Sequence, residues 1–237
     1  MTSRIPVLMY HSIAPASTDY LTVARARFGD HIRHLADHYR ILGLGAIEAG
    51  LDGAAPMASE ALLVTFDDAL EDNLEHALPA LERCGAGAVF FAIAGALGRD
   101  TRWDHKGFRI MPHMTGGDLQ ALVRAGHEVG NHSLTHQRLS KLSRDERTRE
   151  ITEAHQILTA VLGRPPVAFA YPYGSADDHC ATLCRERYRF AFTTVREGGF
   201  DWREDAMRIR RIYVAPTDEP ADLDRKIACY RSGLQHA

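Results

Sequence analysis

The stretch at residues 62–68 reads Leu62-Leu63-Val64-Thr65-Phe66-Asp67-Asp68, an apolar run that ends in two adjacent carboxylates. A short apolar run bounded by polar residues is typical of a buried β-strand. Leucine and alanine then recur at helical spacing, which predicts a helix over residues 70–83. A strand followed directly by a helix is the building unit of a parallel sheet, so this stretch predicts an α/β fold.

The same alternation of short apolar runs and helical patterns continues along the chain, and no linker or low-complexity run interrupts it. We therefore expect one α/β domain over residues 1–237, with parallel strands joined by helical crossovers. A capping box at Ser143 and the residues Gly163 and Pro165 mark the two ends of one long helix. Strands are expected at residues 5–10, 39–42, 61–66, 87–93, 126–130, 167–171, 189–193 and 209–214, and helices at 27–38, 70–83, 116–125, 143–162, 176–188 and 219–232.

Composition and charge exclude several classes of protein. The chain has 237 residues, of which 45% are hydrophobic, so it can bury a large core and is not a disordered chain. A net charge of -3 favours neither nucleic acid nor an anionic membrane surface as a partner. No apolar window approaches about 18 residues and no signal peptide is evident, so we expect a cytoplasmic protein without an integral membrane segment. The sequence predicts no oligomeric state.

The two carboxylates have a structural and a chemical interpretation. Taken alone, Asp68 is best explained as the N-cap of the following helix, a position that aspartate favours. A retaining glycosidase pair fits poorly, because adjacent residues of a strand point to opposite faces. A chemical role therefore depends on what else lies at the same end of the strand.

A second polar group follows another expected strand, and the chain has 13 histidines from which to build it. His132 and His136 are separated by three residues, a spacing at which two imidazoles can share one cation. The carboxyl ends of parallel barrel strands share one face, so these histidines and the aspartates are expected to meet there. One Asp and two His leave open positions for water and substrate, as catalytic zinc sites do. The neighbouring carboxylate would then be free to take a proton from that water.

A third candidate is the loop after the expected strand at residues 167–171. The segment reads Val167-Ala168-Phe169-Ala170-Tyr171-Pro172-Tyr173-Gly174. Its proline and glycine are typical of an ordinary turn. The functional interpretation is a loop that aims a backbone N–H at a developing oxyanion.

Three motifs occur in an order and spacing that resembles the polysaccharide deacetylase family, also called carbohydrate esterase family 4 or the nodulation-protein-B homology domain. They are Thr65-Phe66-Asp67-Asp68, His132-Ser133-Leu134-Thr135-His136 and Tyr171-Pro172-Tyr173-Gly174, and the resemblance covers about residues 5–215. It implies a distorted (β/α)7 barrel and metal-dependent removal of an N-acetyl group from an amino sugar. It also implies the roles of five residues: Asp67 as catalytic base, Asp68, His132 and His136 as metal ligands, and Tyr173 as the backbone donor to the oxyanion. Zinc is the expected metal, although cobalt, nickel or iron suits the same ligands.

The chain departs from the family pattern at two positions near these motifs. The glycine that usually follows the paired aspartates is Ala69 here, which is tolerable unless the backbone needs a positive φ. The arginine that orients the base is replaced by Ala170. Arg208, Arg210 and Arg211, at a late strand, are the candidates to substitute for it, and we expect Arg211 to do so.

The last two family motifs are harder to place. Asp201-Trp202 has the letters of the fourth motif, but it lies in a Gly-containing loop and is better explained as a loop pair, which is a candidate to touch sugar. The general acid of the fifth motif would be His236, in Leu234-Gln235-His236 at the chain end, where termini fray. His11, which follows the first strand, is the other candidate to line the site.

Three functions remain open from the sequence. The first is N-deacetylation of an amino-sugar oligosaccharide or polysaccharide precursor, with release of acetate. The second is hydrolysis of a small amide, a formamide or a ureide by the same fold. The third is carbohydrate binding by a pseudoenzyme, which the retained Asp and His residues disfavour.

Other aromatic and histidine side chains have simpler interpretations. Trp103 and Trp202 are candidates either for stacking on sugar rings or for the core. His31, His34 and His38 recur at helical spacing and are expected on an exposed helix face. Of the 13 histidines, two are therefore expected to bind metal.

Overall fold

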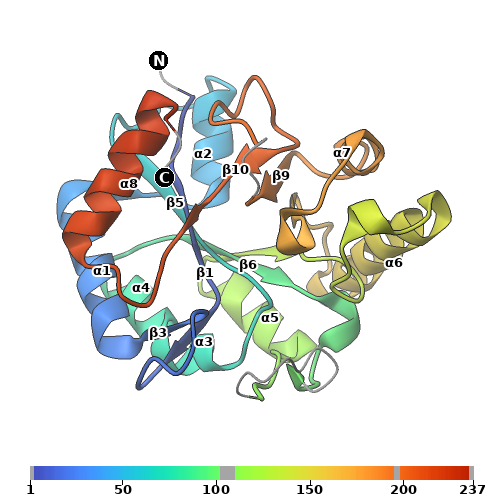
Figure 1. The fold of residues 1–237 in the computed structure, drawn as a ribbon, viewed down its shortest axis with the longest axis horizontal. Helices are drawn as coiled ribbons and strands as arrows, with labels where there is room; N and C mark the ends of the chain where they lie inside the picture. The colour runs from blue at the N-terminus through green and yellow to red at the C-terminus, as the bar shows by residue number, and fades with distance from the viewer. Residues whose placement is uncertain (1–2, 102–109, 195–197, 235–237) are drawn as a thin grey trace.

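Parallel strands form the centre of the computed structural model, which describes residues 3–101, 110–194 and 198–234 (Figure 1). Their spatial order is β10 (Ile209–Arg210), β9 (Phe190–Thr193), β8 (Ala168–Ala170), β7 (Glu128–Asn131), β6 (Ala88–Ala92), β5 (Ala61–Phe66), β1 (Val7–Tyr10) and β11 (Ile212–Tyr213). β4 (Arg40–Ile41) pairs with β5 beside this path. All of these pairings are parallel, as the strand–helix alternation predicts.

One segment of chain joins the two ends of this sheet. β10 pairs with β9 and β11 pairs with β1, although only Arg211 separates β10 from β11. The Arg211 backbone N–H donates to the Thr193 carbonyl at 3.0 Å, and the Val214 N–H donates to the Met9 carbonyl at 3.2 Å. The strand expected at residues 209–214 is therefore shared between two partners and closes the barrel. The expected distorted (β/α)7 barrel, in a single domain, is confirmed, with the β10–β11 segment in the seventh position.

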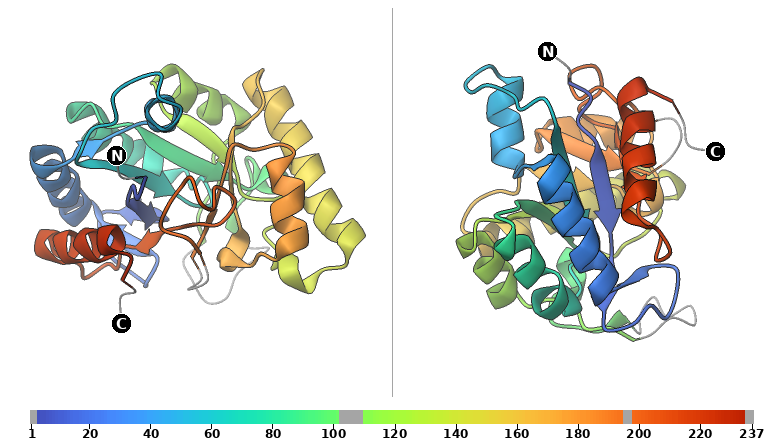
Figure 2. Two further views of the ribbon diagram at one scale, coloured as in Figure 1. Left: turned by 90° about the horizontal axis from the view of Figure 1, so that it is seen from above. Right: turned by 90° about the vertical axis from the view of Figure 1, so that its left-hand side faces the viewer.

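Helices surround the barrel, and α1 and α8 lie side by side along one wall of it (Figures 1 and 2). The described helices are α1 (Arg25–His38), α2 (Leu44–Leu51), α3 (Asp72–His76), α4 (Leu78–Arg83), α5 (Gly116–Arg124), α6 (Arg144–Leu162), α7 (Asp178–Arg185) and α8 (Pro220–Ser232). The long helix α6 begins and ends as expected, because Ser143 forms its capping box and Gly163 takes a left-handed conformation after it. Among the described residues, no helix has both the length and the apolar character needed to cross a membrane.

The central strand β5 divides the core in two, because its successive side chains point to opposite faces. Leu63 packs with Val7, Val89 and Phe192 from other strands, and this cluster fills the barrel. The alternate residue Val64 belongs to a second cluster, which also contains buried residues of α1, α4, α5, α6 and α8 and lies under the helices. Thr65 and Asp67 continue the inward-facing series that begins at Leu63, which aims Asp67 at the barrel mouth.

The prediction of one continuous helix over residues 70–83 is wrong. The segment is divided into α3 and α4 at Ala77, and Pro79 lies in the first turn of α4. Proline lacks a backbone N–H and its ring clashes with the carbonyl four residues earlier, so the helix breaks there. The N-cap of α3 is Glu71 and not Asp68, so helix capping does not explain the second carboxylate.

Three short elements and one buried histidine escaped the sequence analysis. α2 and the two-stranded sheet of β2 (Ser12–Ala14) and β3 (Thr22–Ala24) fall in segments too short for a clear periodic signal. The expectation that the α1 histidines are exposed is wrong for His31, which is fully buried. Its ring shares hydrogen bonds with the Tyr10 hydroxyl and the Asp218 carbonyl, at 3.2 and 2.8 Å.

Candidate active site

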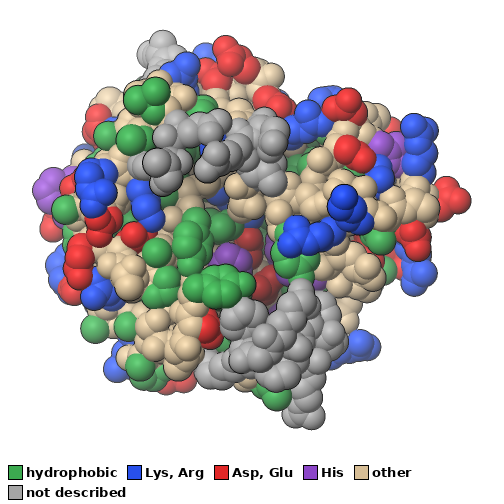
Figure 3. Space-filling view, in the orientation of Figure 1, with side chains coloured by type: hydrophobic (Ala, Val, Ile, Leu, Met, Phe, Trp, Pro, Cys, Tyr) green, Lys and Arg blue, Asp and Glu red, His purple; other side chains and the backbone are tan. Residues whose placement is uncertain are grey.

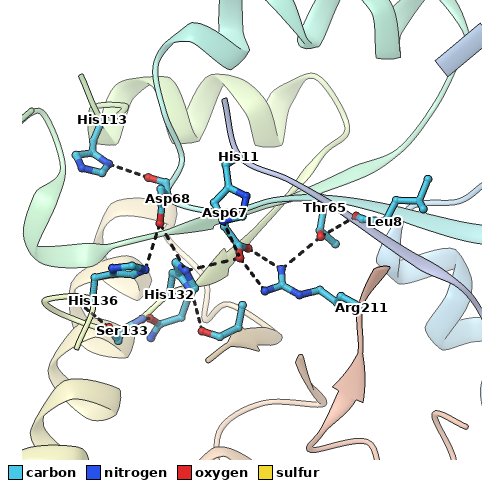
Figure 4. Close-up of polar contacts among 12 residues, drawn as sticks. Leu8, His11, Thr65, Asp67, Asp68, His113, His132, Ser133, His136 and Arg211 are labelled. Carbon is cyan, nitrogen blue, oxygen red and sulfur yellow. Dashed lines mark hydrogen bonds and ion pairs between the residues drawn. The ribbon is translucent and has the colours of Figure 1, made fainter. Parts of the chain in front are cut away.

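The residues that the sequence analysis selected come together at the carboxyl edge of the barrel (Figure 4). They line a cavity of about 510 Å³, and each follows the end of a strand or lies between two strands. Figure 3 shows acidic and histidine side chains at the bottom of a hollow on this face. The selected residues among the lining are His11, Asp67, Asp68, His132, His136, Tyr173 and Arg211.

Backbone strain is concentrated at this edge. Five non-glycine residues among those described have a positive φ, and all five belong to or adjoin the three motifs: Asp68, Ala69, Ser133, His136 and Tyr173. A left-handed backbone costs an L-residue about 1–2 kcal/mol, and such residues cluster at functional sites. The φ of Ala69 is 47°, so alanine here occupies a conformation that favours the glycine usual in the family.

Asp68, His132 and His136 form a set of ligand atoms suited to one cation. All three ligand atoms lie within 4.8 Å of one another. Asp68 Oδ1 is 3.6 Å from His132 Nε2 and 3.5 Å from His136 Nε2. Tetrahedral ligands about 2.0–2.1 Å from a zinc ion are separated by about 3.3 Å, so these spacings are close to a liganded set. In the described part of the chain, buried Asp68 Oδ1 has no hydrogen-bond partner, which a cation would supply.

Hydrogen bonds outside the set orient two of these ligands. His132 Nδ1 donates to the Ala170 carbonyl at 2.8 Å, which leaves Nε2 as the nitrogen with a free lone pair toward the cavity. Burial lowers the pKa of His132 to about 4, against the opposing attraction of Asp67, so the imidazole is neutral as a metal ligand must be. His113 Nδ1 donates to the Asp68 carbonyl at 2.8 Å and holds the strained backbone at that position.

The loop that carries both histidines is held by the buried side chain of Glu150 on α6. Glu150 Oε2 accepts the backbone N–H groups of Leu134 and Thr135 at 3.1 and 2.9 Å, and Oε1 accepts the Thr135 hydroxyl. Ser133 Oγ accepts the His136 backbone N–H at 3.0 Å. Glu150 was not predicted from the sequence, because a Glu inside a helical pattern carries no signal that it is buried.

Asp67 is buried and paired with Arg211 through two hydrogen bonds. Arg211 Nη1 donates to Oδ1 at 2.6 Å and Nη2 donates to Oδ2 at 2.7 Å. Burial alone would raise the pKa of Asp67, but the Arg211 guanidinium and His132 together lower it well below its ordinary value. Asp67 is therefore an ionised carboxylate in a fixed orientation.

The other two candidate arginines lie elsewhere. Arg208 pairs with Asp178 at 2.6 Å, and the Arg210 guanidinium lies 5.1 Å from the centre of the Phe200 ring. Arg211 is the one whose side chain reaches Asp67. Trp202 is buried in the barrel, and its indole N–H donates to the Ile5 carbonyl at 2.9 Å, so of its two expected roles the one in the core is confirmed.

His11 and Tyr173 both line the cavity that contains the aspartates. His11 Nε2 is 3.9 Å from Asp67 Oδ2, and the His11 side chain is 16% exposed to the cavity. Tyr173 follows β8 with a φ of 57°, and its ring centre is 4.7 Å from that of His136. His236 and Trp103 lie outside the described residues.

The fold and the site together define a class of protein. The carboxyl edge of this barrel of parallel strands carries two histidines and an aspartate beside a second, ionised aspartate. This arrangement is typical of hydrolases that use a barrel fold. The sequence pattern of the family described as Polysaccharide deacetylase matches residues 54–187. The chain belongs to the polysaccharide deacetylase family, which confirms the resemblance, and it is an enzyme of polysaccharide deacetylation.

Individual relatives show how far the similarity extends. Bacillus subtilis YxkH, assigned to the polysaccharide deacetylases, is 25% identical over 217 residues, which cover 90% of this chain and 72% of YxkH. The peptidoglycan-N-acetylmuramic acid deacetylase PdaC of Bacillus subtilis is 27% identical over 118 residues, which are 49% of this chain and 22% of PdaC. The structure of the Streptococcus pyogenes deacetylase PplD in complex with acetate matches with a TM-score of 0.80 and 24% identity, and covers 94% of this chain and 97% of that chain. At this identity the likeness to PplD concerns the fold.

Proposed function

We propose that the chain is a metal-dependent hydrolase that removes N-acetyl groups from an amino-sugar oligosaccharide or polysaccharide precursor and releases acetate. The observation that carries this proposal is the position of Asp67. It is an ionised, buried carboxylate with an oxygen 3.8 Å from His132 Nε2, beside a ligand set that it does not belong to. A separate carboxylate next to a metal set can serve as a general base.

Asp68, His132 and His136 would hold the metal, for which zinc is the first choice and cobalt, nickel or iron are alternatives. When bound, such an ion polarises the acetyl carbonyl and lowers the pKa of a bound water. The support for a cation is the donor set itself: a neutral imidazole with a fixed tautomer and a buried carboxylate oxygen that lacks a hydrogen-bond partner among the described residues.

Asp67 takes the proton from the attacking water in this scheme. Its Arg211 partner keeps it ionised and holds its oxygens toward the cavity. The same pairing weakens Asp67 as a base, so it suits a water whose own pKa is already lowered. Arg211 is a positioning residue in this scheme, and it takes the place of the arginine that the family has where this chain has Ala170.

Tyr173 and His11 complete the chemistry. The Tyr173 backbone N–H donates to the developing oxyanion, and a preorganised donor of this kind is worth about 3 kcal/mol of barrier. His11 protonates the departing amine, which its place in the cavity wall and its 3.9 Å distance from Asp67 support. The products are acetate and a free amino sugar.

Acetate release tests this function. Protein stripped of metal and reloaded with zinc would be incubated with chitotetraose, other N-acetylated oligosaccharides, and a set of small amides, formamides and ureides. We expect acetate from the N-acetylated sugars, and none from the metal-free protein. Turnover of the small compounds alone, by protein with one zinc per chain, would assign the second function instead, and binding without turnover would assign the third.

A further inference from the structure

A second cavity of about 460 Å³ adjoins the active-site cavity. Tyr173 and Gly174 line both cavities, so a substrate whose acetamido group lies at Asp67 can extend past Tyr173 into the second one. The proposed reaction uses no other residue of this second cavity. Most of its lining residues are polar or charged, in contrast with the apolar cluster inside the barrel.

The lining of this second cavity has an excess of positive charge. Its two carboxylates are already paired, Asp177 with Arg147 and Asp178 with Arg208. Asp177 also caps α7 by accepting the Cys180 backbone N–H. Two further cations line the cavity, Arg138 and Lys141, and among the described residues neither has a carboxylate partner. Figure 3 shows Lys and Arg side chains gathered at one side of the central hollow.

The first of these cations is close to the reaction centre. The Arg138 guanidinium carbon lies 4.1 Å from the centre of the Tyr173 ring, and the His136 ring centre is 4.7 Å from the same point. Arg138 and the expected metal ligand His136 thus contact the same aromatic ring. An anionic group at Arg138 would belong to the sugar unit next to the one that is deacetylated.

The segment that carries both cations is fixed in place. Arg147 donates to the Leu142 carbonyl at 2.9 Å and to the Ser140 carbonyl at 3.1 Å. The Ser140 and Ser175 hydroxyl oxygens are 2.7 Å apart and add polar groups to the same wall. A rigid backbone that presents two cations and two hydroxyls is preorganised for an oxyanion.

We propose that the second cavity binds an anionic substituent, a carboxylate or a phosphate, on the sugar unit adjacent to the N-acetylated one, through Arg138 and Lys141. This inference rests on the proposed function and names its substrate class: a charged, not a neutral, N-acetylated saccharide. Both cations are exposed at the rim, so they select the substrate without contacting the reacting atoms.

The test compares three substrates that differ only in the group at C6: chitotetraose, chitotetraose oxidised at C6 to the uronate, and chitotetraose 6-phosphate. The readout is kcat/KM for each charged substrate divided by that for chitotetraose, in the zinc-loaded enzyme. We expect a ratio above one for the uronate, the phosphate or both. In Arg138→Gln/Lys141→Gln the ratio should fall about tenfold, because two charge-assisted contacts are lost. Arg33→Gln, which removes a cation from α1, is the control and should keep the wild-type ratio.

The ratio separates this proposal from damage to the active site. Loss of support for Tyr173 would slow all three substrates equally and leave the ratio unchanged. A wild-type ratio of one for both charged substrates, or a ratio that the double substitution does not alter, overturns the proposal while the deacetylase function stands. If no substrate is turned over, titration calorimetry of the same three saccharides gives the ratio of affinities, and equal affinities overturn it as well.

Discussion

Arg211 and Asp67 form a bidentate ion pair inside the barrel, with N–O distances of 2.6 and 2.7 Å. Arg211 lies between β10 and β11, the two short strands that join the ends of the sheet. Asp67 directly follows the central strand β5. The segment that closes the barrel therefore also carries the side chain that holds Asp67, the proposed base.

Replacing Arg211 should damage stability and turnover together. Arg211→Met leaves a buried carboxylate without its partner, which we expect to lower the free energy of unfolding by about 3–5 kcal/mol. Arg211→Lys keeps the charge but cannot make both hydrogen bonds, so it should fall between Met and the wild type. Denaturant titration and kcat measure the two effects. Loss of activity in Arg208→Ala or Arg210→Ala, with Arg211→Ala unaffected, would show that another arginine orients the base.

Glu150 should act on metal affinity through the loop that carries the histidines. Glu150→Gln can no longer accept all three hydrogen bonds from Leu134 and Thr135. Groups that support metal ligands typically contribute about 10–100-fold in affinity, so we expect zinc binding to weaken by about tenfold. Competition with a chromogenic chelator measures it. Glu153→Gln, a half-buried position on the same helix, is the control, and equal zinc affinity in the two variants would show that Glu150 does not support the metal ligands.

Zinc should stabilise the folded chain through His132. Zinc at 100 times its dissociation constant adds about 2.7 kcal/mol to the free energy of unfolding, so Tm should rise when it is added to the stripped protein. His132→Ala should abolish this rise because it removes a ligand. His34→Ala, on α1 beside Asp224, should leave it intact. Differential scanning calorimetry measures the rise in Tm for each variant, and an undiminished rise in His132→Ala would exclude His132 as a ligand.

Buried His31 should make the protein less stable in mild acid. Burial lowers the pKa of His31, so the unfolded chain, with a pKa of about 6.5, takes up a proton that the folded chain does not. The free energy of unfolding should therefore fall as the pH drops below about 6.5, and the His31 contribution should end below its folded pKa. His31→Gln should make the pH dependence shallower in urea titrations, whereas exposed His38→Gln should not. Equal slopes in the two variants would contradict this.

The barrel and the motif residues were predictable because their signals are local. An apolar run that ends in two carboxylates predicted β5, two histidines were expected to follow the strand at residues 126–130, and parallel strands bring such ends to one edge. The division of residues 209–214 between two strands depends on pairing with both ends of the sheet, which no local pattern records. Arg211 could be selected from the sequence only as one of three neighbouring arginines.

The support around the site was not predictable from the sequence for a different reason. Glu150 and His113 act through backbone atoms of distant loops, and their sequence neighbours are ordinary helix and loop residues. Trp202 carried an aromatic signal that suits either sugar or core, and the indole bond to Ile5 shows that it belongs to the core. His31 was misjudged because helical spacing gives the face of a side chain but not what packs on it.

In the proposed reaction, Asp67 activates water beside a metal that it does not hold. The most direct measurement is acetate release from an N-acetylated oligosaccharide by Asp67→Asn, with zinc content determined on the same sample and folding checked by circular dichroism. We expect one zinc per chain and a kcat reduced by about 100-fold or more. A wild-type rate in Asp67→Asn with full zinc would contradict this role of Asp67.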